Sequence, residues 1–209
     1  MPVQLRFATG LTGAQYVTRQ AWREATLARC PLHPRGGCAF GRHGTYKRVQ
    51  PPGTRVARWY CRTGHCTFSL LPDHLAARFP GTLPEIEQVV VAVEQAKSLE
   101  AAADRLRSDA ITLPSAVRWA CRRVAPVRRL LIILVGLLPQ WLQGCAPQLT
   151  AVRARLGCAE ALVGLRGLAW MHLHALGSPL GFRPPPLRAG GHEARFQHDM
   201  GPDPPSGFG

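Results

Sequence analysis

Acidic residues are scarce in this chain, and lysine is almost absent. The 209 residues include 12 Asp and Glu against 26 Lys and Arg, which gives a formal net charge of +14, and the only lysines are Lys47 and Lys97. A chain with this balance attracts polyanions, so we expect nucleic acid or an anionic membrane surface as the partner. The planar guanidinium of arginine suits bidentate contacts with phosphate and guanine. Abundant arginine also follows from a GC-rich genome, so composition favours DNA binding without deciding it.

The chain also lacks the residues of a catalytic domain that cuts nucleic acid with metal ions. Such a domain needs three carboxylates on an α/β framework to activate water. Here the few acidic residues fall largely in helix starts and the C-terminal tail, and no strand-rich segment follows the helical ones. Cys61 and His65 could act as nucleophile and base, but this hypothesis leaves Cys30 and Cys38 without a role. We therefore predict that the protein is not an enzyme.

No apolar segment is long enough for membrane targeting or for crossing a bilayer. Residues 1–20 contain no signal-peptide core, and the apolar run in residues 127–138 is far shorter than the roughly 20 residues of a transmembrane helix. We expect residues 127–142 to form a buried helix or a homodimer contact, although Arg128 and Arg129 keep an interfacial membrane anchor open. The odd number of cysteines favours a reducing cytoplasm, with Cys121, Cys145 and Cys158 as buried thiols.

Residues 30–73 hold two short clusters of cysteine and histidine. The first cluster has the spacing C-x2-H-x4-C and the second C-x3-H-C. Between them, residues 45–50 and 55–60 carry Tyr, Val and Trp among basic residues, and the PPGT stretch at 51–54 supplies a turn, which predicts a β-hairpin. A ribbon this small gains stability from a tetrahedral zinc ion held by two ligand loops. The sequence therefore predicts a zinc ribbon.

Six residues compete for the four ligand positions of this zinc site. The preferred set is Cys30, Cys38, Cys61 and His65, with His33 and Cys66 as substitutes. The alternative is that these residues are ordinary buried thiols and surface histidines.

The same segment resembles the zinc ribbon at the front of bacterial insertion-sequence transposases and of their short associated proteins. The motifs that carry the resemblance are RHGTY, WYC and TFSLLPD. In that family the second knuckle usually reads CxxC before the TFSLLP stretch, whereas here Gly64 occupies the position of the second cysteine. The resemblance extends more weakly to about Arg129 and covers about half of the chain. It implies binding of zinc and double-stranded DNA, and partnership with a transposase catalytic subunit.

Three helices are predicted after the ribbon. Thr82-x-x-Glu85 is a capping box that opens the first, Ser98 caps the second, and the third begins near Leu113 after a turn over residues 107–112. In the third helix, Val117, Ala120, Cys121 and Val124 are expected to face inward. Its outward face is expected to carry Ser115, Arg118 and Arg122, with Arg123 beside them.

This order of helices matches a helix-turn-helix, whose last helix reads the major groove of DNA. The words SLEAAADRL and LPSAVRW also resemble transposase helix-turn-helix segments. A helical bundle with a solvated basic face is the alternative. Further phosphate contacts are expected from the ribbon, through Lys47, Arg48, Arg55 and Arg58.

We therefore predict an α+β, mostly helical fold. The expected parts are an N-terminal extension (1–29, with a short helix at 21–28), the zinc ribbon (30–75), the helix-turn-helix (82–125), an apolar helical segment (127–177) and a disordered tail (178–209). The predicted function is that of a zinc-dependent DNA-binding protein of mobile-element type. A zinc-ribbon protein-interaction adaptor and a peripheral membrane protein are the alternatives.

Overall fold

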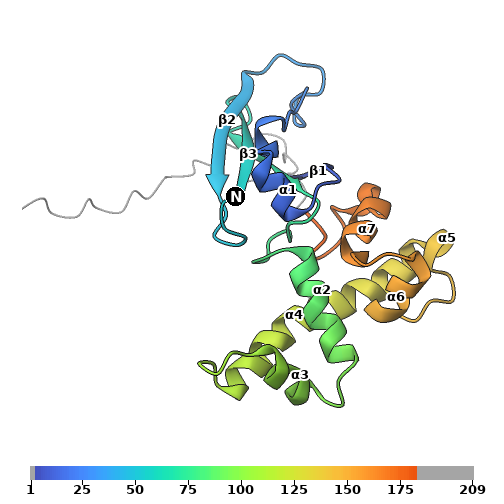
Figure 1. The fold of residues 1–209 in the computed structure, drawn as a ribbon. Helices are drawn as coiled ribbons and strands as arrows, with labels where there is room; N and C mark the ends of the chain where they lie inside the picture. The colour runs from blue at the N-terminus through green and yellow to red at the C-terminus, as the bar shows by residue number, and fades with distance from the viewer. Residues whose placement is uncertain (1–2, 183–209) are drawn as a thin grey trace, which may run out of the picture.

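A four-stranded sheet and a set of helices make up the computed structural model, which describes residues 3–182 (Figure 1). The α+β, mostly helical fold class is thus confirmed. Of the predicted C-terminal tail, residues 183–209 lie outside the described residues.

The sheet contains the predicted hairpin and two further strands. Its strands are β1 (Val3–Phe7), β2 (Phe40–Lys47), β3 (Arg55–Cys61) and β4 (Cys66–Pro72), in the order β1-β4-β3-β2. The hairpin β2–β3 is antiparallel, as is β3–β4, whereas β1 runs parallel to β4. β2 begins five residues earlier than predicted and ends three residues earlier, because it extends to pair Phe40 with Cys61.

The N-terminal residues are an integral part of the sheet domain rather than an extension to it. After β1 come helix α1 (Gly13–Thr18) and the single 3-10 turn η1 (Ala21–Arg23), where a helix over 21–28 had been predicted. Tyr16 and Trp22 are buried with their rings 5.8 Å apart, and the Tyr16 hydroxyl donates to the Arg55 carbonyl at 3.0 Å. β1 pairs with a strand more than 60 residues away. Local hydrophobic periodicity in residues 1–29 therefore does not reveal it.

The three predicted helices begin at the predicted positions, the first two at their predicted caps. They are α2 (Leu83–Glu94), α3 (Leu99–Leu106) and α4 (Leu113–Leu137). Thr82 and Glu85 form the capping box, with hydrogen bonds of 3.2 and 2.7 Å, and the Ser98 hydroxyl accepts from the Ala101 amide at 3.1 Å. These local signals are short-range, so the sequence alone could locate them.

Helix α4 continues through Pro126, where we had predicted a break between the helix-turn-helix and the apolar segment. A proline removes one backbone N–H and usually kinks or ends a helix. Here the residues on both sides are anchored, because Val124, Val127 and Leu130 are all at most 3% exposed in the same core. One 25-residue helix therefore belongs to both predicted segments.

Two glutamates of α2 cap the helices that follow α4. After the short α5 (Pro139–Leu142) come α6 (Leu149–Leu156), α7 (Ala161–Leu168) and the turn η2 (Trp170–His172). Neither α6 nor α7 is capped by a side chain of its own N-cap residue. Instead, Glu94 accepts from the first two amides of α6 at 2.8 Å, and buried Glu87 accepts from those of α7 at 3.0 and 2.9 Å. These carboxylates are seven residues apart, so α2 holds both helices along one side.

A buried arginine joins the sheet domain to the helices. Arg166 is fully buried and donates to the carbonyls of Asp73, Leu75 and Pro179 at 2.8, 2.6 and 2.7 Å. Its guanidinium also lies over the ring of Phe182, which is 2% exposed. Residues 178–182, which we had assigned to a disordered tail, are therefore packed into the core.

Candidate metal centre and basic surfaces

Three thiols and one imidazole converge where the first knuckle meets the end of β3. The ligand atoms of Cys30, His33, Cys38 and Cys61 all lie within 4.8 Å of one another. Cys30 and Cys61 are buried, while His33 and Cys38 are partly exposed. The His33 amide donates to the Cys30 carbonyl at 3.1 Å in a tight turn. This turn brings the side chains of Cys30 and His33 to the same centre.

The distances within this cluster fit a tetrahedral metal ion. With metal–sulfur bonds of about 2.3 Å and metal–nitrogen bonds of about 2.0–2.1 Å, a tetrahedral zinc ion separates a sulfur from a nitrogen ligand by about 3.5 Å. The Nδ1 atom of His33 lies 3.5 Å from the sulfur of Cys30 and 3.4 Å from that of Cys61. These two distances match that geometry, so the cluster could bind a metal ion.

A glycine closes the site from the second knuckle. The Gly64 amide donates to the Cys61 sulfur at 3.2 Å, the kind of outer hydrogen bond that orients a metal ligand. A Cβ atom on Gly64 would lie 2.7 Å from Leu32 Cδ1 and 3.3 Å from the Cys61 sulfur. A side chain at this position would therefore have to move the Leu32 side chain and press against the Cys61 sulfur.

The pKa values of Cys30 and Cys38 are shifted in opposite directions. Burial acts to raise the pKa of Cys30, but the Leu32 and His33 amides and the neighbouring thiols outweigh it, so the pKa is lowered. The pKa of Cys38 is raised to about 11 by desolvation and by its two cysteine neighbours. One thiolate thus opposes the next, and a bound divalent ion would favour deprotonation of all three.

Of the six predicted ligand candidates, His65 and Cys66 lie outside this group. His65, which we preferred as the fourth ligand, is exposed, and its Nδ1 is 3.4 Å from the Tyr60 hydroxyl. Cys66 is 7% exposed and pairs in register with Cys61 across β3 and β4. Its pKa is raised by burial and then by the Cys61 and Cys30 charges. The cluster thus takes His33 in place of His65.

The predicted DNA-contacting residues of α4 are partly available. Arg118 and Arg122 are exposed on one face, while the Ser115 hydroxyl accepts from the Arg118 guanidinium at 3.2 Å. Arg123 is partly buried, with its guanidinium 4.1 Å from the centre of the Trp119 ring.

Cys121 is exposed, which corrects the prediction that it faces inward, because α4 buries Ala116, Ala120 and Val124 instead. Cys145 and Cys158 are only partly buried.

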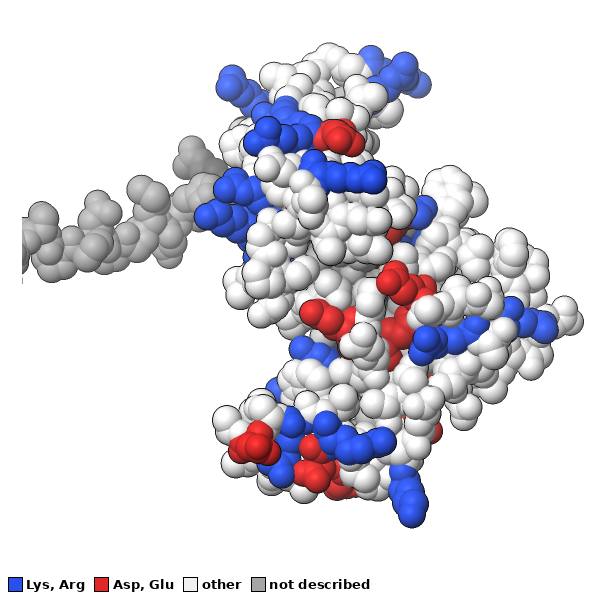
Figure 2. Space-filling model, viewed as in Figure 1, with Lys and Arg blue, Asp and Glu red and all other residues white. Residues whose placement is uncertain are grey.

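The predicted contacts on the ribbon divide into exposed residues and residues that contact the rest of the protein. Lys47 and Arg55 are exposed, and the Arg55 guanidinium donates to the Thr45 hydroxyl at 3.4 Å. Arg48 donates to the carbonyls of Ala76 and Phe79 at 3.3 and 3.0 Å, so it ties the hairpin to the chain leading into α2. Arg58 is partly buried over the Tyr46 ring. In the view of Figure 2, basic side chains stand out over the sheet, and acidic side chains gather mainly over the helical part.

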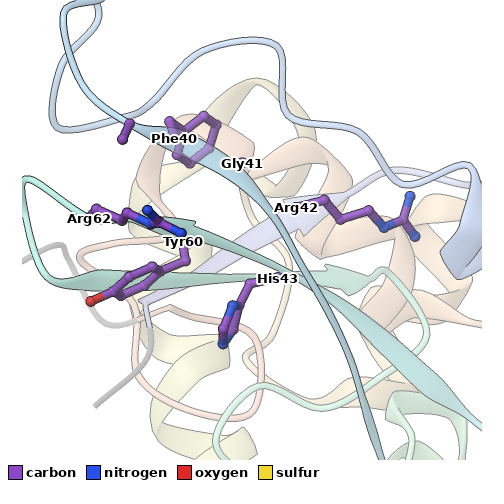
Figure 3. A pocket seen from close by; sticks show the side chains of 7 residues that line it. Phe40, Gly41, Arg42, His43, Tyr60 and Arg62 are labelled. Carbon is purple, nitrogen blue, oxygen red and sulfur yellow. The ribbon is translucent and has the colours of Figure 1, made fainter.

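Sequence reasoning missed two surface features. Arg129 continues the exposed basic face of α4 beyond Pro126, with exposed Arg128 beside it, whereas the sequence predicts a break at this proline. His43, Tyr60 and Arg62 line an open hollow at the edge of the sheet (Figure 3). The RHGTY and WYC motifs contain two of them, but only the strand register shows that they meet.

Comparison with protein-family models, curated proteins and solved structures gave no match. Among residues 3–182, no helix combines the length and apolar character needed to cross a membrane.

Proposed function

We propose that the chain is a zinc-stabilised DNA-binding protein of mobile-element type, acting by binding and not by catalysis. One observation supports it most: α4 has five arginines and no acidic residue over its 25 residues. At 1.5 Å per residue the helix is about 37 Å long. Four of its arginines are exposed, namely Arg118, Arg122, Arg128 and Arg129. Such a stripe can follow the phosphates beside a groove, releasing counterions as it binds.

The helices around α4 support the same proposal. α2 and α3 pack against α4, with a turn over residues 107–112 between α3 and α4. Arg107 steadies this turn by donating to the Ile111 carbonyl at 3.0 Å and pairing with Asp104 at 2.7 Å. The arrangement leaves the N-terminal part of α4 free on its outer face, as a recognition helix requires. Zinc is the metal that we propose for the site, because three thiolates and an imidazole are ligands that it prefers.

A titration of the purified protein with labelled duplex DNA at several salt concentrations tests this proposal. Arg118→Ala should lower affinity for the preferred sequence by about 1–3 kcal/mol and affinity for random duplex far less. Arg48→Ala is the matched control, because its guanidinium is already bonded to carbonyls within the protein. Affinity that does not change with salt, or equal losses from both substitutions on every sequence, would refute the role of α4.

A second candidate function is protein interaction through the C-terminal half of α4. Ile132 and Ile133, one helical turn after Arg128 and Arg129, are 62% and 50% exposed. An exposed apolar pair on a helix is typical of a contact with another protein, which would be a transposase catalytic subunit or a second copy of the chain. Such binding should depend far less on salt than DNA binding does.

A further inference from the structure

We propose that the hollow at the β2 edge of the sheet binds single-stranded nucleic acid, through base stacking on Tyr60 and His43 and a phosphate contact with Arg62. The inference rests on the proposed function and adds a second ligand form to it. The hollow has a volume of about 300 Å³, and none of the seven described residues that line it is acidic.

A β-bulge creates the aromatic surface of this hollow. The register of β2 and β3 shifts between Arg42 and Thr45, and Gly44 at its centre has φ +73°. Bulges of this kind re-aim a side chain at a strand edge. Here His43 is brought beside Tyr60, with 5.4 Å between the ring centres and 40° between the ring planes. His43 is exposed and Tyr60 is partly exposed, so the two rings offer a sequence-tolerant surface for stacking a base.

Two basic residues flank these rings, and they have different roles. Arg42 donates to the carbonyls of Arg23 and Trp22 at 2.7 and 2.6 Å, so its charge is held by the protein. Arg62 is exposed, and no hydrogen bond or ion pair with another described residue engages its guanidinium. Figure 3 shows Arg62 close to Tyr60, whereas the Arg42 side chain points away from the two rings. Arg62 is therefore the residue free to take a phosphate.

The metal centre supports both walls of the hollow. Ala39 and Phe40 directly follow the ligand Cys38, and Arg62 directly follows the ligand Cys61. The Arg62 amide also donates to the Ala39 carbonyl at 3.0 Å, which joins the two walls. A bound metal would fix these segments relative to each other, so the hollow should lose its ligand when the metal is removed.

A single strand fits this surface better than a duplex. Bases in a duplex are stacked within the helix and cannot lie on protein rings, whereas bases of a single strand can. The exposed arginine stripe of α4 is the surface that suits a duplex. The two surfaces should therefore respond separately to substitution.

The test compares two probes, a labelled oligothymidine of about 10 nucleotides and a labelled duplex. Tyr60→Leu should weaken binding of the single strand roughly 5- to 150-fold, as for loss of one stacked base, and leave duplex binding unchanged. Arg62→Gln should weaken single-strand binding and reduce its salt dependence by about 0.7 per phosphate contact. Arg35→Gln is the matched control, because it removes an exposed arginine from the ligand loop outside the hollow.

Zinc content and circular dichroism show whether each variant is folded. If Tyr60→Leu does not fold, His43→Ala replaces it in the binding test. Unchanged single-strand affinity in a folded Tyr60→Leu or His43→Ala protein would overturn the inference. If the wild-type protein binds the duplex but not oligothymidine, the inference fails and the α4 proposal stands. If it binds oligothymidine but not the duplex, the α4 proposal fails, and the Tyr60→Leu result decides the inference. If thymidine monophosphate competes for this site as effectively as unlabelled oligothymidine does, the preference for a strand over a single nucleotide is overturned.

Discussion

Substitution of His33 should weaken metal binding strongly, whereas substitution of His65 should not. Both histidines fall in the two knuckles, and the sequence pattern alone favoured His65. In the structure the Nδ1 atom of His33 lies 3.5 and 3.4 Å from two of the ligand sulfurs, while His65 is exposed and faces the Tyr60 hydroxyl. His33→Ala and His65→Ala therefore form a matched pair that differs in ligand geometry alone.

The expected effect follows from the share of one ligand in a four-ligand site. Structural zinc sites bind with roughly 10–16 kcal/mol at neutral pH, so one ligand of four accounts for about 2.5–4 kcal/mol. His33→Ala should therefore weaken zinc binding about 100- to 1,000-fold. His65→Ala should stay within about 3-fold of the wild type, a difference of less than 1 kcal/mol.

Zinc affinity can be measured by competition with a chromogenic chelator, and stoichiometry by metal analysis of the purified proteins. Cys66→Ser is a useful thiol control, because Cys66 is buried beside Cys61 but lies outside the four-residue group. A zinc affinity of His33→Ala equal to that of the wild type, or a 100-fold loss of affinity in His65→Ala, would refute the ligand set. Absence of zinc from the wild-type protein in zinc-supplemented medium would remove the zinc assignment itself.

Two further predictions concern stability. Glu87→Ala leaves two buried amides of α7 without an acceptor and should lower the free energy of unfolding by about 3–5 kcal/mol in a urea titration. Glu94→Ala, at a less buried position, should cost about 1–2 kcal/mol, and equal costs would refute the comparison. Burial and then the Arg166 charge lower the pKa of His74 from 6.5 to about 4. The contribution of neutral His74 to the free energy of unfolding is therefore complete above pH 6.5 and is lost as the pH falls toward 4. That loss is about 3 kcal/mol, and His74→Phe should abolish it; identical pH profiles of the two proteins would contradict this reasoning.

Features set by a few neighbouring residues could be predicted from the sequence. The caps at Thr82 and Ser98 and the hairpin turn depend on contacts within four or five residues, and all three are present. The parallel pairing of β1 with β4 has no such local signal. Neither has the capping of α7 by Glu87, a residue more than 70 positions earlier.

Pro126 illustrates how packing overrides a local rule. A single missing hydrogen bond and the proline ring cost about 3 kcal/mol or more within a helix. Fully burying one Leu or Val side chain stabilises by about 1.5–3 kcal/mol, and seven residues of α4 are buried, on both sides of Pro126. Continuing the helix keeps all of them in the core, so the burial outweighs the proline.

The choice among six ligand candidates also depends on three-dimensional register. Cys61 ends β3 and belongs to the four-residue group, and Gly64 then packs against the Leu32 side chain and the Cys61 sulfur. The four-residue group therefore takes one member, Cys61, from the second knuckle and three from the first. Spacing alone could not exclude His65, because the turn that carries it outward includes His65 itself at φ +44°.

The position of the metal site in the small sheet core explains what a metal would stabilise. Cys30 and Cys61 are buried with Val3, Cys66 and Phe68 in a cluster separate from the large core of the helices. A core of so few apolar side chains stabilises a fold only weakly. Small cores of this kind depend on metals or disulfides. Since the seven cysteines are free thiols, a metal is the cross-link open to this cluster. It would tie the ligand loop to β3, and so hold the edge of the sheet, while the helical core is held by its own burial.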